Sequence, residues 1–172
     1  TVISGGSVGE EIDRELMEAG AIARRFPYQK TSAARERAND GRLAFHDRHV
    51  SRLADEVVYG HLGDVDVALV EAVAVGEDWL IPSTSVGQTP AYVQAADRVI
   101  VEVNHAQPRE LAELHDIYRP ATPPNREPVP LTAPGERIGG PRAAFDPDAL
   151  AAVVETDRRD STYSFRDPTA AD

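Results

Sequence analysis

The run of residues 65–75 constrains the fold of this chain more than any other segment. It is apolar and rich in β-branched side chains, and only Asp66 and Glu71 interrupt it. Such a run is typical of a strand that is covered on both faces, as the strands of parallel sheets are. It is too short to span a bilayer, which needs about 18 consecutive apolar residues. We therefore expect a buried strand over residues 65–73.

The segments that follow indicate how this strand is connected. Residues 78–82 could return as a hairpin arm. Thr89-Pro90 combines a cap residue with proline at the first helical position, which predicts a helix to about Ala96. Residues 98–104 read as the next strand. Strand, helix and strand in this order predict parallel pairing through a crossover. The expected fold class is α/β, with an open, mostly parallel sheet flanked by helices.

The remaining elements are predicted from periodicity, caps and turn residues. Strands are expected at 1–3 and 43–46, and helices at 10–19, 31–38, 50–59 and 146–154. The expected caps are Thr31 or Ser32, Ser51 and Asp146. The segment 120–147 holds eight of the 13 prolines, which predicts an extended, wrapping course. We assign residues 1–156 to one domain and 157–172 to a polar tail or linker toward a further domain.

Composition limits the partners of this chain. The net charge of -11 argues against a nucleic-acid partner, because phosphate binding requires clustered cations. There is no cysteine, so a metal site would have to consist of His and carboxylate side chains. His46 and His49 could share a helix face, but no third ligand stands at a familiar spacing. We therefore expect no metal, no membrane segment and no signal peptide, and a cytoplasmic, reducing compartment is compatible.

Two loops carry residue types suited to an anion or acyl pocket. The loop 4–9 leads from a strand into a helix, where backbone N–H groups attract anions. Glu10, Glu11 and Asp13 follow it and would repel a phosphate, so a tight turn is favoured over a dinucleotide site. The loop Ser83-Thr84-Ser85-Val86-Gly87-Gln88 could hold a carboxylate or acyl oxygen. It could equally be a capped loop.

Glu71 lies near the carboxyl end of the most buried strand, where open α/β sheets bind their ligands. It could act as a general base or pocket wall, or it could be paired with an arginine or a loop backbone. Glu102 and Asn104, on the later strand, present the same alternatives. A Ser-His-Asp triad that uses His115-Asp116 is disfavoured, because there is no Gly-x-Ser-x-Gly elbow.

Several short segments stand in collinear order from Thr1 to about Asp160. The segments are Ile3-Ser4-Gly5-Gly6-Ser7, Phe26-Pro27-Tyr28-Gln29, residues 35–49, Asp66-Val67-Ala68-Leu69-Val70-Glu71-Ala72, Glu77-Asp78, Ile81-Pro82-Ser83-Thr84-Ser85-Val86-Gly87, Val99-Ile100-Val101-Glu102-Val103-Asn104, Leu114-His115-Asp116-Ile117-Tyr118 and Arg137-Ile138-Gly139. In this order they resemble the acetyl-CoA hydrolase and succinyl-CoA:acetate CoA-transferase family. Trp79 stands where the family usually has glycine, which argues against a tight turn there.

The resemblance implies the first of two α/β domains of the class I CoA-transferase type (the NagB/RpiA type), without its first strand and helix. It implies that a glutamate in the second domain, outside this chain, attacks the acyl-CoA and then carries CoA as a glutamyl thioester. Coenzyme A would be a substrate and no cofactor is implied. The partners implied are acyl-CoA, small carboxylates, the missing domain and a second copy in a homodimer. This chain alone is expected to be inactive.

The resemblance also implies that three loops line the cleft between the domains. The pocket residues expected from them, together with Glu71, are Ser4, Gly5, Gly6, Tyr28, Gln29, Lys30, Ser83, Thr84, Ser85, Val86, Gly87 and Gln88. Two other functions remain open. One is a ligand-sensing module of related fold without turnover, and the other is a nucleotide-binding oxidoreductase domain that uses the loop 4–9.

Overall fold

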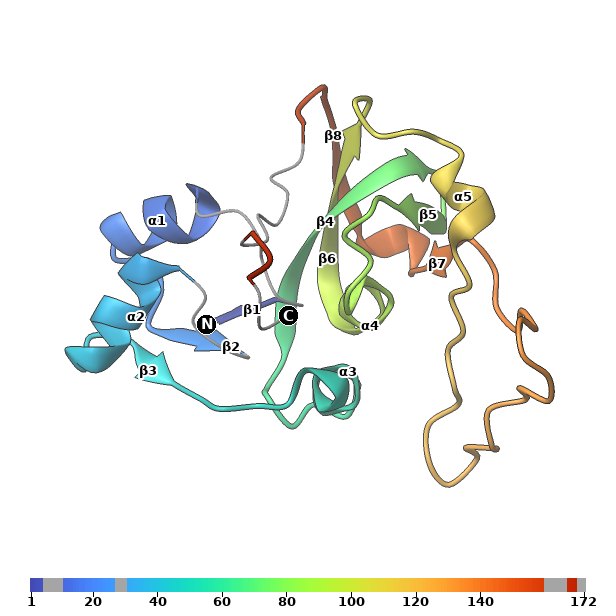
Figure 1. Cartoon of the computed structure of the whole chain (residues 1–172), viewed down its shortest axis with the longest axis horizontal. Coiled ribbons are helices and arrows are strands. Elements are labelled where there is room, and N and C mark those ends of the chain that lie inside the picture. The colour runs from blue at the N-terminus through green and yellow to red at the C-terminus, as the bar shows by residue number, and fades with distance from the viewer. Residues whose placement is uncertain (5–10, 27–30, 160–166, 170–172) are drawn as a thin grey trace. The chain divides into compact units, whose positions relative to one another are not determined.

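The computed structural model describes residues 1–4, 11–26, 31–159 and 167–169 (Figure 1). The chain divides into two compact units. We call them the N-terminal unit, which is Thr1–Val50 with Arg159–Asp172, and the central unit, which is Ser51–Arg158.

The N-terminal unit is a small parallel sheet with two helices. Its elements are β1 (Val2–Ile3), α1 (Glu11–Glu18), β2 (Arg24–Phe26), α2 (Ser32–Asn39) and β3 (Ala44–Phe45). The strand order is β1-β2-β3, and both pairings are parallel. Met17, Ile22, Ala34 and Leu43 form its buried apolar core. Thr31 caps α2 as predicted, since its hydroxyl accepts the Ala34 N–H at 3.2 Å.

The central unit is built on a five-stranded sheet. Its elements are α3 (Val50–Val58), β4 (Val65–Val75), β5 (Trp79–Pro82), α4 (Thr89–Ala95), β6 (Ala96–Asn104), α5 (Leu111–Leu114), β7 (Ala143–Ala144) and β8 (Leu150–Thr156). The strand order is β7-β5-β4-β6-β8. The pairs β4–β6 and β6–β8 are parallel, and β5 is antiparallel to both β4 and β7. The α/β class and the predicted parallel crossover are therefore confirmed.

One face of this sheet carries the core of the unit. Ala68, Val70 and Ala72 of β4 pack there with Val93 of α4. Within the central unit the opposite face is open, and Leu69 of β4 keeps 63% of its surface exposed there. The central unit by itself therefore covers one face of this strand, where we expected both faces to be covered.

The turn between β4 and β5 is tight despite Trp79. The Gly76 N–H donates to the Trp79 carbonyl at 2.8 Å. The indole ring lies so close to Gly76 that a Cβ there would overlap it, and the Arg142 guanidinium stacks over the ring at 4.0 Å from its centroid. The expectation that tryptophan disfavours a tight turn is wrong, because glycine at position 76 leaves room for the ring.

Three details of the predicted helices are also wrong. The expected helix 146–154 is one 3-10 turn, Pro147–Ala149, followed by strand β8. Asp146 does cap that turn, but the β-branched residues beyond it favour a strand that pairs in parallel with β6. The helix α3 already begins at Val50, so Ser51 is not its cap. The helix α4 is preceded by Gln88, and Thr89 is its first residue.

The Pro-rich segment is extended, as predicted. In Figure 1 it is the long orange loop on the right, which has no helix or strand from residue 119 to 138. Arg126 fastens it to α3, because its guanidinium donates to the Asp55 carboxylate at 2.9 Å and to the Tyr59 hydroxyl at 2.8 Å. This contact also lowers the pKa of Asp55 below its ordinary value of 3.8.

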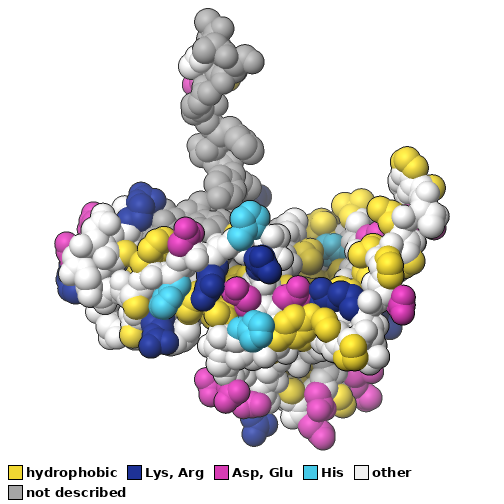
Figure 2. Space-filling view, turned by 90° about the horizontal axis from the view of Figure 1, so that it is seen from below, with side chains coloured by type: hydrophobic (Ala, Val, Ile, Leu, Met, Phe, Trp, Pro, Cys, Tyr) yellow, Lys and Arg dark blue, Asp and Glu magenta, His cyan; other side chains and the backbone are white. Residues whose placement is uncertain are grey.

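Two surface properties follow from the described residues. On the face shown in Figure 2, Lys and Arg side chains lie scattered among Asp and Glu side chains rather than in one continuous basic patch. No helix within the described ranges has both the length and the apolar character that crossing a bilayer requires.

Candidate functional site

A cluster of polar side chains lies where the parallel strands of the central unit end. Glu71 of β4 is in register with Glu102 of β6, so the carboxyl ends of both strands lie at the same edge. The Ser83 hydroxyl, just after β5, donates to Oε2 of Glu71. The Asn104 amide, at the end of β6, donates to Oε1 of the same carboxylate at 2.6 Å. Both oxygens of Glu71 are therefore held by neutral donors.

Asn104 connects this carboxylate to the chain beyond β8. Its amide group also donates to the Arg158 carbonyl at 2.7 Å. Its side-chain oxygen accepts the N–H groups of Ala106 at 3.0 Å and Arg158 at 3.2 Å. Two donated and two accepted bonds use the full capacity of an asparagine amide. Because Asn104 is only 2% exposed, this saturation is what makes its burial tolerable.

The loop from Ser83 to Gln88 leads away from this cluster into α4. Ser83 is fully buried, and its hydroxyl oxygen accepts the Ser85 N–H at 3.2 Å. Thr84, Ser85 and Gly87 are exposed, and Val86 and Gln88 are half-buried. Gly87 has a φ of 44°, a left-handed conformation that favours glycine. The structure thus brings Glu71 together with Ser83 and places two exposed hydroxyls on the adjoining loop.

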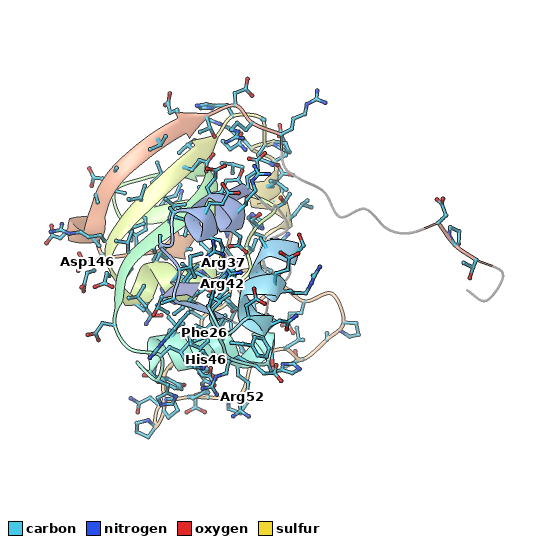
Figure 3. The ribbon with its side chains drawn as sticks, turned by 90° about the vertical axis from the view of Figure 1, so that its left-hand side faces the viewer. Phe26, Arg37, Arg42, His46, Arg52 and Asp146 are labelled. Atoms are coloured by element: carbon cyan, nitrogen blue, oxygen red, sulfur yellow. The ribbon has the colours of Figure 1, made fainter. Side chains whose placement is uncertain are left out.

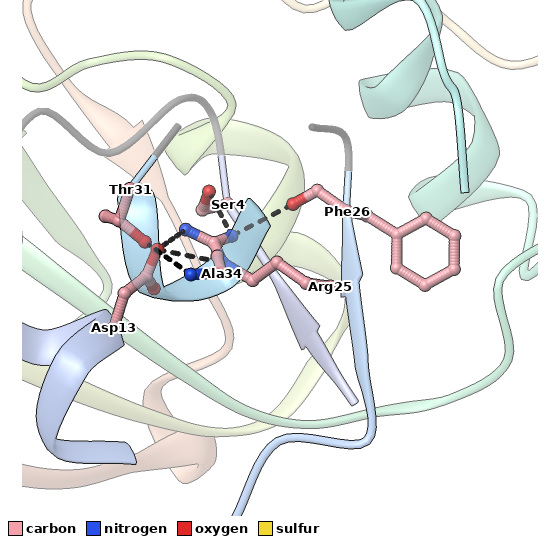
Figure 4. A network of polar contacts seen from close by, with 6 residues as sticks. All are labelled: Ser4, Asp13, Arg25, Phe26, Thr31 and Ala34. Carbon is pink, nitrogen blue, oxygen red and sulfur yellow. Dashed lines mark hydrogen bonds and ion pairs between the residues drawn. The ribbon is translucent and has the colours of Figure 1, made fainter. Parts of the chain in front are cut away.

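Ser4, the first of the expected pocket residues, belongs to a buried network in the N-terminal unit (Figure 4). Its hydroxyl accepts a bond from Nη1 of Arg25 at 2.6 Å. The same guanidinium forms an ion pair with Asp13 at 2.9 Å, and both charged side chains are almost fully buried. The other expected pocket residues of this part of the chain lie outside the described residues. They are Gly5, Gly6, Tyr28, Gln29 and Lys30.

His46, one of the two histidines considered for a metal, packs against an aromatic ring. The His46 ring stacks on Phe26, with 4.7 Å between ring centroids and 20° between planes, and Figure 3 shows the two side chains next to each other. Within the described ranges, no group of three potential metal-binding side chains is present.

The residues considered for a triad are used for structure. His115 Nε2 contacts the Pro82 carbonyl oxygen at 2.7 Å. The Asp116 carboxylate accepts the Gly139 N–H at 2.6 Å and the Ile138 N–H at 3.1 Å. Sequence reasoning missed both contacts, since the partner of each side chain lies more than 20 residues away. The adjacent His115 and Asp116 were noticed in the sequence, but only as candidate members of a catalytic triad.

Open α/β sheets with a polar cluster at the carboxyl ends of their strands form a broad class of ligand-binding domains. Comparison with known proteins specifies the family. The family model described as the acetyl-CoA hydrolase/transferase N-terminal domain matches residues 1–157. The chain therefore belongs to the acetyl-CoA hydrolase/transferase family.

Relatives in three organisms agree with this assignment. The chain is 43% identical over 163 residues to a succinyl-CoA:acetate CoA-transferase of Clostridium kluyveri, covering 94% of the chain and 30% of the relative. It is 38% identical to a propanoyl-CoA:succinate CoA transferase of Escherichia coli, covering 93% and 33%. It is 36% identical to an acetyl-CoA hydrolase of Yarrowia lipolytica, covering 91% and 31%. The chain thus spans about a third of the length of these curated relatives.

Proposed function

We propose that the complete protein moves CoA between an acyl-CoA and a small carboxylate such as acetate or succinate, or hydrolyses the acyl-CoA. In this proposal residues 1–172 supply one wall of the pocket, and the reactive glutamate lies outside them. The names of the relatives, which include both CoA-transferases and acetyl-CoA hydrolases, support the choice of chemistry. Their greater length leaves room for a second domain.

The proposed reaction proceeds by covalent catalysis. A glutamate carboxylate attacks the thioester carbonyl carbon, the C–S bond breaks, and CoA thiolate leaves with the electron pair. The thiolate then attacks the glutamyl carbonyl of the anhydride, which releases the acyl group as a carboxylate and leaves CoA as a glutamyl thioester. An acceptor carboxylate takes up CoA by the reverse steps. Water in place of the acceptor completes hydrolysis.

One observation carries the role of this chain. The carboxylate of Glu71 is fixed by Ser83 and Asn104 at the edge of the sheet where the parallel strands end. A carboxylate bonded on both oxygens is poorly placed to act as a nucleophile, but it holds the loop that carries Thr84 and Ser85. We propose that this loop contacts the acyl group or the acceptor carboxylate. The contributions of Ser4, Gly5, Gly6, Tyr28, Gln29 and Lys30 to the same pocket remain part of this proposal.

Coenzyme A acts as a substrate, with no further cofactor, and the complete protein is a cytoplasmic homodimer. The lack of cysteine in these residues is compatible with a reducing compartment. Light scattering of the complete protein during size-exclusion chromatography measures the oligomeric state directly.

The covalent adduct tests the proposed division of labour. The complete protein is incubated with acetyl-CoA and its peptides are mapped by mass spectrometry. We expect a CoA thioester on a glutamate outside residues 1–172. The variant Glu77→Gln, in the exposed turn before β5, is the control and should form the adduct as the wild type does. A CoA adduct on Glu71, Glu77 or Glu102 would show that this chain carries the nucleophile. Absence of both adduct and turnover would refute the proposed activity.

A further inference from the structure

The proposed chemistry leaves one buried titratable side chain of the central unit without a role. His115 follows α5 and is only 9% exposed. Its Nε2 lies 2.7 Å from the carbonyl oxygen of Pro82, the residue directly before Ser83. A carbonyl oxygen can only accept a hydrogen bond, so Nε2 carries the ring hydrogen and is the donor of this bond. His115 thus holds the end of β5 at the residue that leads into the candidate pocket loop.

The backbone around His115 is joined to the base of the Pro-rich segment. The Arg137 guanidinium donates to the carbonyl oxygens of Glu113, at 2.6 Å, and His115. The next residue of the chain, Asp116, binds the N–H groups of Ile138 and Gly139. Ile117 and Gly140 then form an antiparallel bridge, with bonds of 2.8 and 3.1 Å. The two ends of the long loop are therefore closed at the residues that flank the histidine.

A continuous set of contacts leads from this closure to the polar cluster. Arg137 binds the His115 carbonyl, the His115 ring binds the Pro82 carbonyl, and the next residue, Ser83, binds Glu71. Each step is a hydrogen bond or the covalent link between two neighbouring residues, and all of these residues lie in the central unit. Removal of the histidine ring would interrupt the set at its middle, and the Pro82 carbonyl would lose its side-chain partner.

We propose that His115 is a positioning residue for the acceptor carboxylate. It fixes the carboxyl end of β5, so that the loop Ser83 to Gln88 is held in one conformation for binding. This inference rests on the proposed function, because the loop is assigned to the substrate pocket there. Its role differs from that of a triad base, since the ring donates a hydrogen bond to a backbone carbonyl and transfers no proton to or from the substrate. Both the Nε2-protonated neutral ring and the imidazolium can make this bond.

Two variants at position 115 separate positioning from catalysis. His115→Ala removes the donor, and His115→Gln keeps an N–H group at similar reach. In the complete protein, we expect His115→Ala to raise the KM for acetate about tenfold, the effect of losing one buried hydrogen bond, with a smaller change in kcat. His115→Gln should restore most of the affinity. The pH profile should keep its shape in both variants. The matched control is His105→Gln, since His105 is a half-exposed surface residue.

Hydrogen exchange tests the same inference without turnover. In residues 1–172, His115→Ala should speed amide exchange at Ser83 and Ser85 about tenfold, while the amides of β6 keep their wild-type rates. Unchanged exchange at both serines would overturn the positioning role, and so would an unchanged KM in a folded variant. Loss of one limb of the pH profile in His115→Gln would make the residue a catalytic base instead. If the wild-type complete protein shows no CoA chemistry, the proposed function fails, and exchange still decides whether His115 fixes the loop.

Discussion

Adjacent glycines near the Pro-rich segment have different requirements. A Cβ at Gly139 would overlap the Ile117 carbonyl, whereas a Cβ at Gly140 would meet nothing within 4 Å. We expect Gly139→Ala to lower the free energy of unfolding by about 1–3 kcal/mol, because backbone cannot move aside as a flexible side chain can. Gly140→Ala should change it by less than about 0.5 kcal/mol. Urea unfolding of both variants measures the difference, and equal effects would contradict the close approach.

The sequence identified the residues of the polar cluster but not their bonds. Glu71 and Asn104 could be placed near strand ends, because the carboxyl ends of parallel strands lie at one edge. Ser83 was found through the composition of its loop. Its bond to Glu71 depends on the register that sets Ala72 opposite Pro82, and on a bulge in that ladder. Side-chain periodicity fixes which face a residue lies on, but it does not fix this register.

At the scale of elements, local signals succeeded where one residue decides the outcome. The cap of α2 is such a case, because Thr31 can bond the Ala34 N–H without help from any distant segment. The strand β8 is the opposite case. The 3-10 turn before it obeys the Asp146-Pro147 signal, but from Leu150 onward the chain pairs with β6, more than 40 residues away. Tertiary pairing overrides helix propensity here, and no local pattern could have announced the available edge.

The contact between α3 and the Pro-rich segment should depend on pH. Hydrogen bonds from Arg126 are the largest cause of the lowered pKa of Asp55 in the folded chain. A lowered carboxyl pKa contributes stability at pH values above the ordinary pKa of 3.8, and this stability is lost as the pH falls through the folded pKa. The window therefore lies below about pH 4. The effect should be small, because both side chains are substantially exposed.

Urea unfolding of the wild type and of Asp55→Asn, at pH values from about 2 to about 7, measures this contribution to the free energy of unfolding. The wild type should be the more stable at neutral pH, and the difference should vanish at the acid end. The double variant Asp55→Asn/Arg126→Gln is the control, since a second substitution should cost little once the pair is broken. A difference that grows toward acid pH would contradict the ion pair.

At the scale of the whole chain, the two units have separate cores. Met17 belongs to one and Leu80 to the other, and both are almost fully buried. Truncation of either to alanine should cost about 2–5 kcal/mol. We expect Met17→Ala to speed amide exchange mainly in α1 and α2, and Leu80→Ala mainly in β4, β5 and β6. Equal acceleration in both units by either variant would contradict this division.

The fold class and the family could be predicted from the sequence, but the coverage of the sheet could not. The order of strand, helix and strand defines a parallel crossover whatever surrounds it. Whether Val67 and Leu69 are covered depends on which segments pack against the open face, and an apolar run does not contain that information. The run 65–75 has the composition of a strand buried on both faces, whereas the central unit's own elements cover only one.

The packing of Trp79 has a consequence for optical experiments. It is the chain's single tryptophan, enclosed by Gly76 and the Arg142 guanidinium. Selective excitation of the indole therefore reports on the β4–β5 hairpin and on the residue that precedes β7. Emission from this chain follows the central unit alone, and melting of the N-terminal unit would be spectroscopically silent unless a second indole were introduced there.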